Sequence, residues 1–144
     1  MRRLKCRAVF LTGPGGRSQL AAKLPENVYV CEYAPYSELF AKAAVIVHQG
    51  GIGTTAQALR GGVPMVVVPY LHDQPDNAFR VKRLGVARVV QRADYNPARA
   101  VEAIRSLQTQ PEYRRRAQEL AARIQQEDGV RCAATVLEQY AARA

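Results

Sequence analysis

Short apolar runs alternate with helix-forming stretches along this chain, and the alternation constrains its fold more than any other feature. Each run is followed closely by glycine, proline or polar residues. Buried strands separated by helices are typical of a parallel sheet with helices on both faces. The sequence therefore predicts an α/β fold. The expected strands are residues 8–11, 28–31, 44–47, 65–68 and 86–90.

Helical periodicity and helix-end signals place helices between the expected strands and after the last one. Pro97 and Pro111 suit the first turn of a helix. The expected helices are residues 18–23, 36–40, 54–60, 76–84, 97–107, 111–126 and 130–142. In the last of these, Val136, Leu137 and Tyr140 are expected to pack on the rest of the protein. Because no linker separates these elements, residues 1–144 are expected to form a single domain.

The net charge of the chain is strongly positive. It is +9, from 21 basic and 12 acidic residues. A positive charge attracts anions in general. The basic residues are spread along the chain, however, and no basic stripe is interleaved with aromatic residues as in a nucleic-acid groove. We therefore interpret the charge as a solvated surface and expect no nucleic-acid partner.

Cysteine usage and hydropathy bear on the cellular compartment. Cys6, Cys31 and Cys132 are odd in number and widely spaced, so they form no metal-binding motif and no disulfide framework. Reduced thiols are typical of a cytoplasmic protein, which is the localisation we expect. No apolar run approaches the ~20 residues that span a bilayer, so no transmembrane segment is expected.

A glycine-rich turn follows the third expected strand. It begins at His48 and continues through Gly51 and Gly53 to Thr54 and Thr55, where a helix is expected to start. Glycine lets a backbone approach a ligand closely. The free N–H groups and the positive end of the helix dipole favour an anion, most often a phosphate. The sequence therefore predicts a phosphate-binding turn.

Residues 33–89 resemble the donor-binding, C-terminal half of GT-B glycosyltransferases that use nucleotide-activated sugars. That family includes sterol, macrolide, glycopeptide-antibiotic and plant secondary-metabolite transferases. The motifs that carry the resemblance are the segments 48–55, 62–64, 73–78 and 84–86, together with Pro69. Their order and spacing are far more specific than a lone glycine-rich turn. The resemblance implies a Rossmann-like parallel sheet flanked by helices, and a nucleoside diphosphate sugar as substrate, with UDP as the first candidate.

The resemblance also assigns roles within the turn. His48 matches the histidine that faces the donor diphosphate and stabilises the charge of the leaving group. The alternative is a histidine at a strand end that only holds the turn. Gly51, Gly53, Thr54 and Thr55 match the residues that hold the phosphates, although the threonines could also cap the helix. Because a helix end and a histidine can neutralise the leaving group, we expect no metal ion and no cofactor.

Other matched residues surround the sugar and the nucleoside. Asp73 and Gln74 match the pair that hydrogen-bonds sugar hydroxyls, with capping of the following helix as the alternative role for the acid. Tyr33 and Ala34 match the segment that cradles the nucleobase, although Tyr33 could equally be a half-buried tyrosine at a strand end. Gln57 stands where many relatives have a ribose-binding glutamate.

The resemblance leaves the acceptor-binding half of such enzymes unmatched. That half carries the catalytic base, so we expect no catalytic residue in this chain and an N-terminal acceptor domain, or a separate chain, as its partner. The resemblance also implies that the first, central strand of the sheet is lacking, which exposes strand edges and favours self-association. The leading hypothesis is the donor-binding domain of an inverting, metal-independent glycosyltransferase that moves a hexose to an acceptor hydroxyl. The alternative is a non-catalytic truncated module that acts as a subunit or interaction partner.

Overall fold

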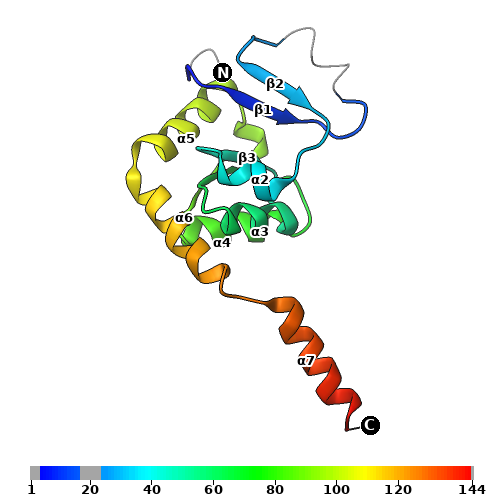
Figure 1. Cartoon of the computed structure of the whole chain (residues 1–144). Helices are drawn as coiled ribbons and strands as arrows, with labels where there is room; N and C mark the ends of the chain where they lie inside the picture. The colour runs from blue at the N-terminus through cyan, green and yellow to red at the C-terminus, as the bar shows by residue number, and fades with distance from the viewer. Residues whose placement is uncertain (1–3, 17–23, 144) are drawn as a thin grey trace.

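The computed structural model describes residues 4–16 and 24–143, and it confirms the predicted α/β class (Figure 1). Apart from α7, the helices pack around short parallel strands. All the expected strands are present, with bounds within two residues of those predicted at most ends. They are β1 (Ala8–Leu11), β2 (Val28–Cys31), β3 (Ile46–His48), β4 (Met65–Val67) and β5 (Ala87–Val89).

The strands form two separate parallel sheets. β1 pairs only with β2, whereas the second sheet has the order β3-β4-β5. Within the described residues no strand joins the β1-β2 pair to the three-stranded sheet. This separation is what a missing central strand predicts.

Among the described residues, one edge of β3 has no partner strand, and the hydrogen bonds identify it. In β3, the Ile46 N–H donates to the Pro64 carbonyl (3.1 Å) and the His48 carbonyl accepts from the Val68 N–H (2.9 Å), so both residues face β4. Backbone groups alternate between the two sides of a strand, and those of Val47 therefore point away from β4. The side chains of Val9 and Val47 are 45% and 43% exposed, which is unusual for a doubly wound sheet.

The helices agree with the sequence-based expectations at most positions. Helix α4 begins two residues earlier than predicted because Pro75 fits its first turn. The expected helix over residues 18–23 lies outside the described residues. The helices are α2 (Tyr36–Ala41), α3 (Ile52–Arg60), α4 (Gln74–Arg83), α5 (Pro97–Thr109), α6 (Pro111–Ile124) and α7 (Gly129–Ala141), with a short 3-10 helix, η2, at Arg92–Asp94.

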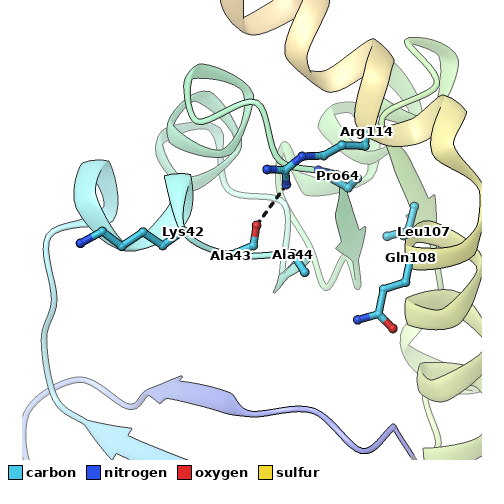
Figure 2. A pocket seen from close by; sticks show the side chains of 7 residues that line it. All are labelled: Lys42, Ala43, Ala44, Pro64, Leu107, Gln108 and Arg114. Atoms are coloured by element: carbon cyan, nitrogen blue, oxygen red, sulfur yellow. Dashed lines mark hydrogen bonds between the residues drawn. The ribbon is translucent and has the colours of Figure 1, made fainter.

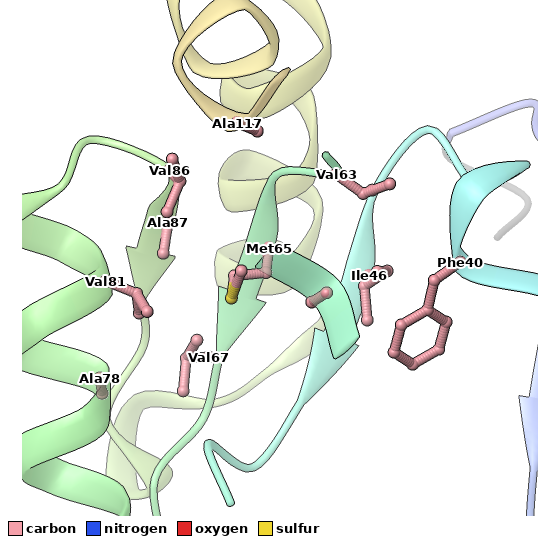
Figure 3. Close-up of a cluster of buried hydrophobic side chains, with 11 residues drawn as sticks. Phe40, Ile46, Val63, Met65, Val67, Ala78, Val81, Val86, Ala87 and Ala117 are labelled. Carbon is pink, nitrogen blue, oxygen red and sulfur yellow. The ribbon is translucent and has the colours of Figure 1, made fainter. Parts of the chain in front are cut away.

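The hydrophobic core surrounds β4, whose residues are buried on both faces. Side chains alternate along the strand, so Met65 and Val67 point to one face and Val66 to the other. On the first face they meet α3, α4 and α6 (Figure 3). On the second face, Ala103 and Leu107 of α5 cover Val66. The strand at the centre of the fold is therefore fixed by apolar packing on both sides.

Helix α7 projects away from the rest of the chain (Figure 1). The expected packing residues Val136, Leu137 and Tyr140 are 63%, 69% and 77% exposed, so that prediction is wrong for the chain by itself. The helix is amphipathic but finds no partner among the described residues. In the part of the chain that the structure describes, no helix is long and apolar enough to cross a membrane.

Candidate functional site

The predicted site residues lie in loops that follow the carboxyl ends of neighbouring strands. The glycine turn follows β3, and Asp73 and Gln74 lie beyond β4. Since β3 and β4 are parallel and paired, the two loops emerge at the same edge of the sheet. Ligands of open α/β sheets bind at this edge.

The backbone of Gly50 is the most tightly constrained part of the glycine turn. Its φ of 95° lies in the region that favours glycine, and a Cβ atom there would stand 2.8 Å from Cγ1 of Val67. Its N–H donates to Nδ1 of His48 (3.0 Å), and its carbonyl accepts from Nδ2 of Asn77 (2.9 Å). The Gly50 backbone is therefore held from both sides, by β3 and by α4.

His48 is partly buried at the end of β3 and is engaged within the protein. Because its Nδ1 accepts the Gly50 N–H, the ring proton of the neutral form lies on Nε2, which is 3.3 Å from Sδ of Met65. Burial lowers the pKa of His48 to about 4. The imidazole is thus neutral near pH 7 and holds the turn, which is the alternative role that the sequence left open. To face a phosphate, Nε2 must leave Met65.

The N-terminus of α3 offers a set of hydrogen-bond donors. Gly51 occupies the N-cap position, and no side chain of the described residues caps the helix. The backbone N–H groups of Ile52, Gly53 and Thr54 lie in the first helical turn, where they have no partner within the helix. Half-buried Thr54 adds a hydroxyl that makes no hydrogen bond among the described residues. This helix end is therefore open to an anion.

Thr55 and Gln57 occupy different positions on the same helix. Thr55 is only 3% exposed, and its hydroxyl donates to the Gly51 carbonyl (2.9 Å). The structure thus engages the Thr55 hydroxyl inside the helix rather than presenting it at the helix end. Gln57 is exposed on the next turn.

Asp73 and Gln74 lie at the start of α4. Asp73 stands at the N-cap position but makes no side-chain capping bond, which argues against the capping role. One oxygen of its carboxylate, Oδ2, accepts from Nδ2 of Asn77 (2.7 Å). The Oε1 atom of Gln74 accepts from the Tyr70 N–H (2.9 Å), which leaves its amide N–H groups to donate elsewhere. Among the described residues no group of three or more acidic, histidine or cysteine side chains could hold a metal ion.

Tyr33 and Ala34 follow β2, on the other sheet. Tyr33 is 82% exposed, which contradicts a half-buried position, whereas Ala34 is partly buried. The structure joins the turn, Asp73 and Gln74 through neighbouring strands. The described hydrogen bonds and ring contacts do not join Tyr33 to them.

Two residues of this network had no role in the sequence-based interpretation. Asn77 lies within the matched motif, but its contacts to both loops could not be read from the motif alone. Its spacing of four residues from Asp73 is the available signal, because positions i and i+4 share one face of a helix. Gly50 precedes the glycines that were assigned to the phosphates, and only the structure shows that it carries the positive φ.

An open pocket of about 530 Å³ lies away from the glycine turn (Figure 2). Ala43, Ala44 and Pro64 line it, and they precede β3 and β4, so the pocket is at the amino ends of the strands. Arg114 closes one side by donating to the Ala43 carbonyl (3.1 Å). The pocket is therefore separate from the glycine turn, which lies at the carboxyl ends of the strands.

Curated proteins with similar sequences are glycosyltransferases. A relative from Streptomyces fradiae, O-mycaminosyltylonolide 6-deoxyallosyltransferase, is 37% identical over 136 residues, which is 94% of this chain and 31% of the relative. A sterol 3-beta-glucosyltransferase from Arabidopsis thaliana is 35% identical over 88% of the chain and 21% of its own length. The chain thus spans about a third or less of the curated relatives it matches.

Solved structures give the same result. The kitacinnamycin glycotransferase superposes with a TM-score of 0.84 at 33% identity, over 92% of this chain and 34% of the other. Glycosyltransferase VinC, solved in complex with dTDP, gives 0.86 at 29% identity, over 97% of this chain and 35% of the other. The family model "Erythromycin biosynthesis protein CIII-like, C-terminal domain" matches residues 7–136. The chain therefore belongs to this family, the C-terminal domain of glycosyltransferases with the GT-B fold.

Proposed function

We propose that this chain binds the nucleoside diphosphate sugar for an inverting, metal-independent glycosyltransferase. The observation that carries the proposal is the uncapped N-terminus of α3, held in place by the Gly50 peptide, beside an acid and an amide at the start of α4. Such an arrangement provides donors for two phosphates and both donors and acceptors for sugar hydroxyls.

The diphosphate would lie against the first turn of α3. The N–H groups of Gly53 and Thr54 and the Thr54 hydroxyl would donate to its oxygens, and the helix dipole would favour its charge. His48 would contribute once Nε2 turns from Met65, and the phosphate would then raise the pKa of the imidazole above the value of about 4 that burial gives it in the unliganded chain. These groups neutralise the leaving group without a metal ion.

The sugar and the nucleoside would extend to opposite sides of the diphosphate. The free oxygen of Asp73 accepts hydrogen bonds from two hydroxyls, and the Gln74 amide donates to a third. Tyr33 and Ala34 would meet the base, with Gln57 near the ribose. UDP is the first candidate from the sequence, and the dTDP complex of VinC makes a pyrimidine nucleotide with deoxyribose the second.

In the proposed reaction an acceptor hydroxyl attacks the anomeric carbon in line with the leaving diphosphate. The new C–O bond forms as the old one breaks, the nucleoside diphosphate keeps the bonding electrons, and the configuration inverts. The proton of the hydroxyl goes to a base in an N-terminal acceptor domain, either in the same polypeptide or in a separate chain. We also propose a cytoplasmic location, because the three cysteines of the sequence are odd in number and too widely spaced to indicate a disulfide framework.

Isothermal titration with UDP and dTDP tests the proposal. A nucleotide whose free concentration is a hundred times its Kd would also raise the free energy of unfolding of the chain by about 2.7 kcal/mol. Thr54→Val keeps the shape of the side chain and removes one donor to a charged group, so affinity should fall about tenfold. Thr135→Val is the matched control, because Thr135 is an exposed helical threonine of α7 whose hydroxyl donates to the Arg131 carbonyl (2.9 Å).

Chelation by EDTA should leave the affinity unchanged, because the site uses no metal ion. The proposal is contradicted if neither nucleotide binds at millimolar concentration, or if Thr54→Val and Thr135→Val behave alike.

A further inference from the structure

One side-chain amide connects the two halves of the proposed site. Nδ2 of Asn77 carries two hydrogens, and the structure gives each an acceptor: the Gly50 carbonyl at 2.9 Å and Oδ2 of Asp73 at 2.7 Å. Gly50 belongs to the glycine turn after β3, whereas Asp73 belongs to the loop after β4. Both loops therefore rest on the same nitrogen atom.

The two halves depend on this nitrogen to different degrees. Gly50 has a second tie through His48, and its backbone also packs tightly against Val67. The Asp73 carboxylate, by contrast, has no other hydrogen bond among the described residues, and it is exposed to solvent. Without Asn77, the turn keeps its position, whereas the Asp73 side chain is free to rotate.

We propose that Asn77 is a positioning residue that sets the Asp73 carboxylate at a fixed distance from the diphosphate turn and thereby makes the site selective for the sugar-bearing nucleotide. This inference rests on the proposed function, and it adds to that function the residue that links diphosphate recognition to sugar recognition. Asn77 itself acts through Asp73 and Gly50 rather than on the substrate. The contact uses both hydrogens of the amide nitrogen.

Asn77→Asp is the sharpest variant, because it keeps the size of the side chain while replacing both donors with an acceptor that faces the Gly50 carbonyl and Asp73. The assay compares the affinity of the chain for UDP and UDP-glucose, and for dTDP and dTDP-glucose. We expect the affinity for each nucleotide sugar to fall about tenfold, the equivalent of one charge-assisted hydrogen bond. The affinity for the nucleoside diphosphates should change by no more than about twofold, because the Gly50 backbone remains packed against Val67.

Asn77→Ala and Leu107→Val complete the set. Asn77→Ala removes the donors without adding charge and should show the same selective loss. Leu107 is buried beside the pocket at the opposite end of the strands, so Leu107→Val lowers stability without touching the site. Its ratio of sugar-nucleotide to nucleotide affinity should equal that of the parent chain.

A spectroscopic readout separates positioning from stability. The Gly50 carbonyl and the Gly51 N–H share one peptide unit, so loss of the Asn77 bond should shift the Gly51 amide resonance in the free chain. Equal losses for both ligand types, or an unmoved Gly51 resonance in Asn77→Asp, would overturn the inference. Failure of the parent chain to bind any nucleotide would instead contradict the proposed function, and the Gly51 resonance would still decide whether Asn77 bonds to the turn.

Discussion

His48 makes the stability of this protein depend on pH in a calculable way. Burial lowers its pKa to about 4 in the folded chain, against 6.5 for the free side chain. As pH falls below 6.5, His48 binds a proton in the unfolded state, whereas in the folded state it does not do so until about pH 4. The contribution of His48 to stability is therefore complete above pH 6.5 and lost as pH falls toward 4. The loss amounts to about 2 kcal/mol by pH 5 and about 3 kcal/mol in all.

Urea unfolding at pH 7.5 and at pH 5.0 measures this loss, followed by helical circular dichroism. His48→Asn is the informative variant, because an amide oxygen can accept the Gly50 N–H but does not titrate. The free energy of unfolding of the variant should fall about 2 kcal/mol less than that of the parent between the two pH values.

His72→Asn is the matched control for a histidine at an exposed position. His72 has a φ of 60°, which asparagine tolerates well. The control should keep the pH dependence of the parent chain. An equal loss of free energy of unfolding by His48→Asn and the parent at pH 5.0 would contradict the burial of a neutral His48.

Four further substitutions test the turn, the core and the surface. Gly50→Ala places a Cβ 2.8 Å from Val67 and should destabilise the chain by more than about 1 kcal/mol in urea unfolding. A Cβ at Gly53 has nothing within 4 Å, so Gly53→Ala should stabilise the chain slightly yet weaken nucleotide binding in titrations. Equal stability of the two variants would contradict the turn geometry. Met65→Ala removes a fully buried side chain and should lower the free energy of unfolding by about 2–5 kcal/mol, and a loss below that range would show that the core collapses to fill the space. Arg115→Ala breaks two exposed ion pairs and should leave the urea midpoint unchanged at any salt concentration, so a clear shift at low salt would show that this helix depends on them.

The sequence predicted the elements well because their signals are local. Apolar runs, first-turn prolines and the glycine turn depend on neighbouring residues, and the structure confirms the strands and helices that they indicate among the described residues. The family motif assigned the turn and the start of α4 to one nucleotide-sugar site, and the paired strands β3 and β4 bring both to one edge of the sheet. Helix α7 shows where this reasoning ends, because amphipathic spacing predicts an apolar face but not whether anything covers it.

The details of the site depend on contacts between loops that are distant in the sequence. The tautomer of His48 follows from the Gly50 N–H, and the orientation of Asp73 follows from Asn77. The position of Thr55 inside the helix rather than at its open end depends on the phase of the first turn. None of these is determined by residue type or spacing alone.

The division of the strands into two sheets also has a consequence for how the protein unfolds. Neither of the two clusters of buried apolar residues around β4 contains a residue of β1 or β2. The β1–β2 pair therefore forms a separate cooperative unit, expected to open at a lower free energy than the helices and strands around Met65. Because Tyr33 follows β2 and the glycine turn follows β3, the nucleobase side of the proposed site can melt while the phosphate side stays folded. Nucleotide binding would then couple the two units and make their unfolding more cooperative.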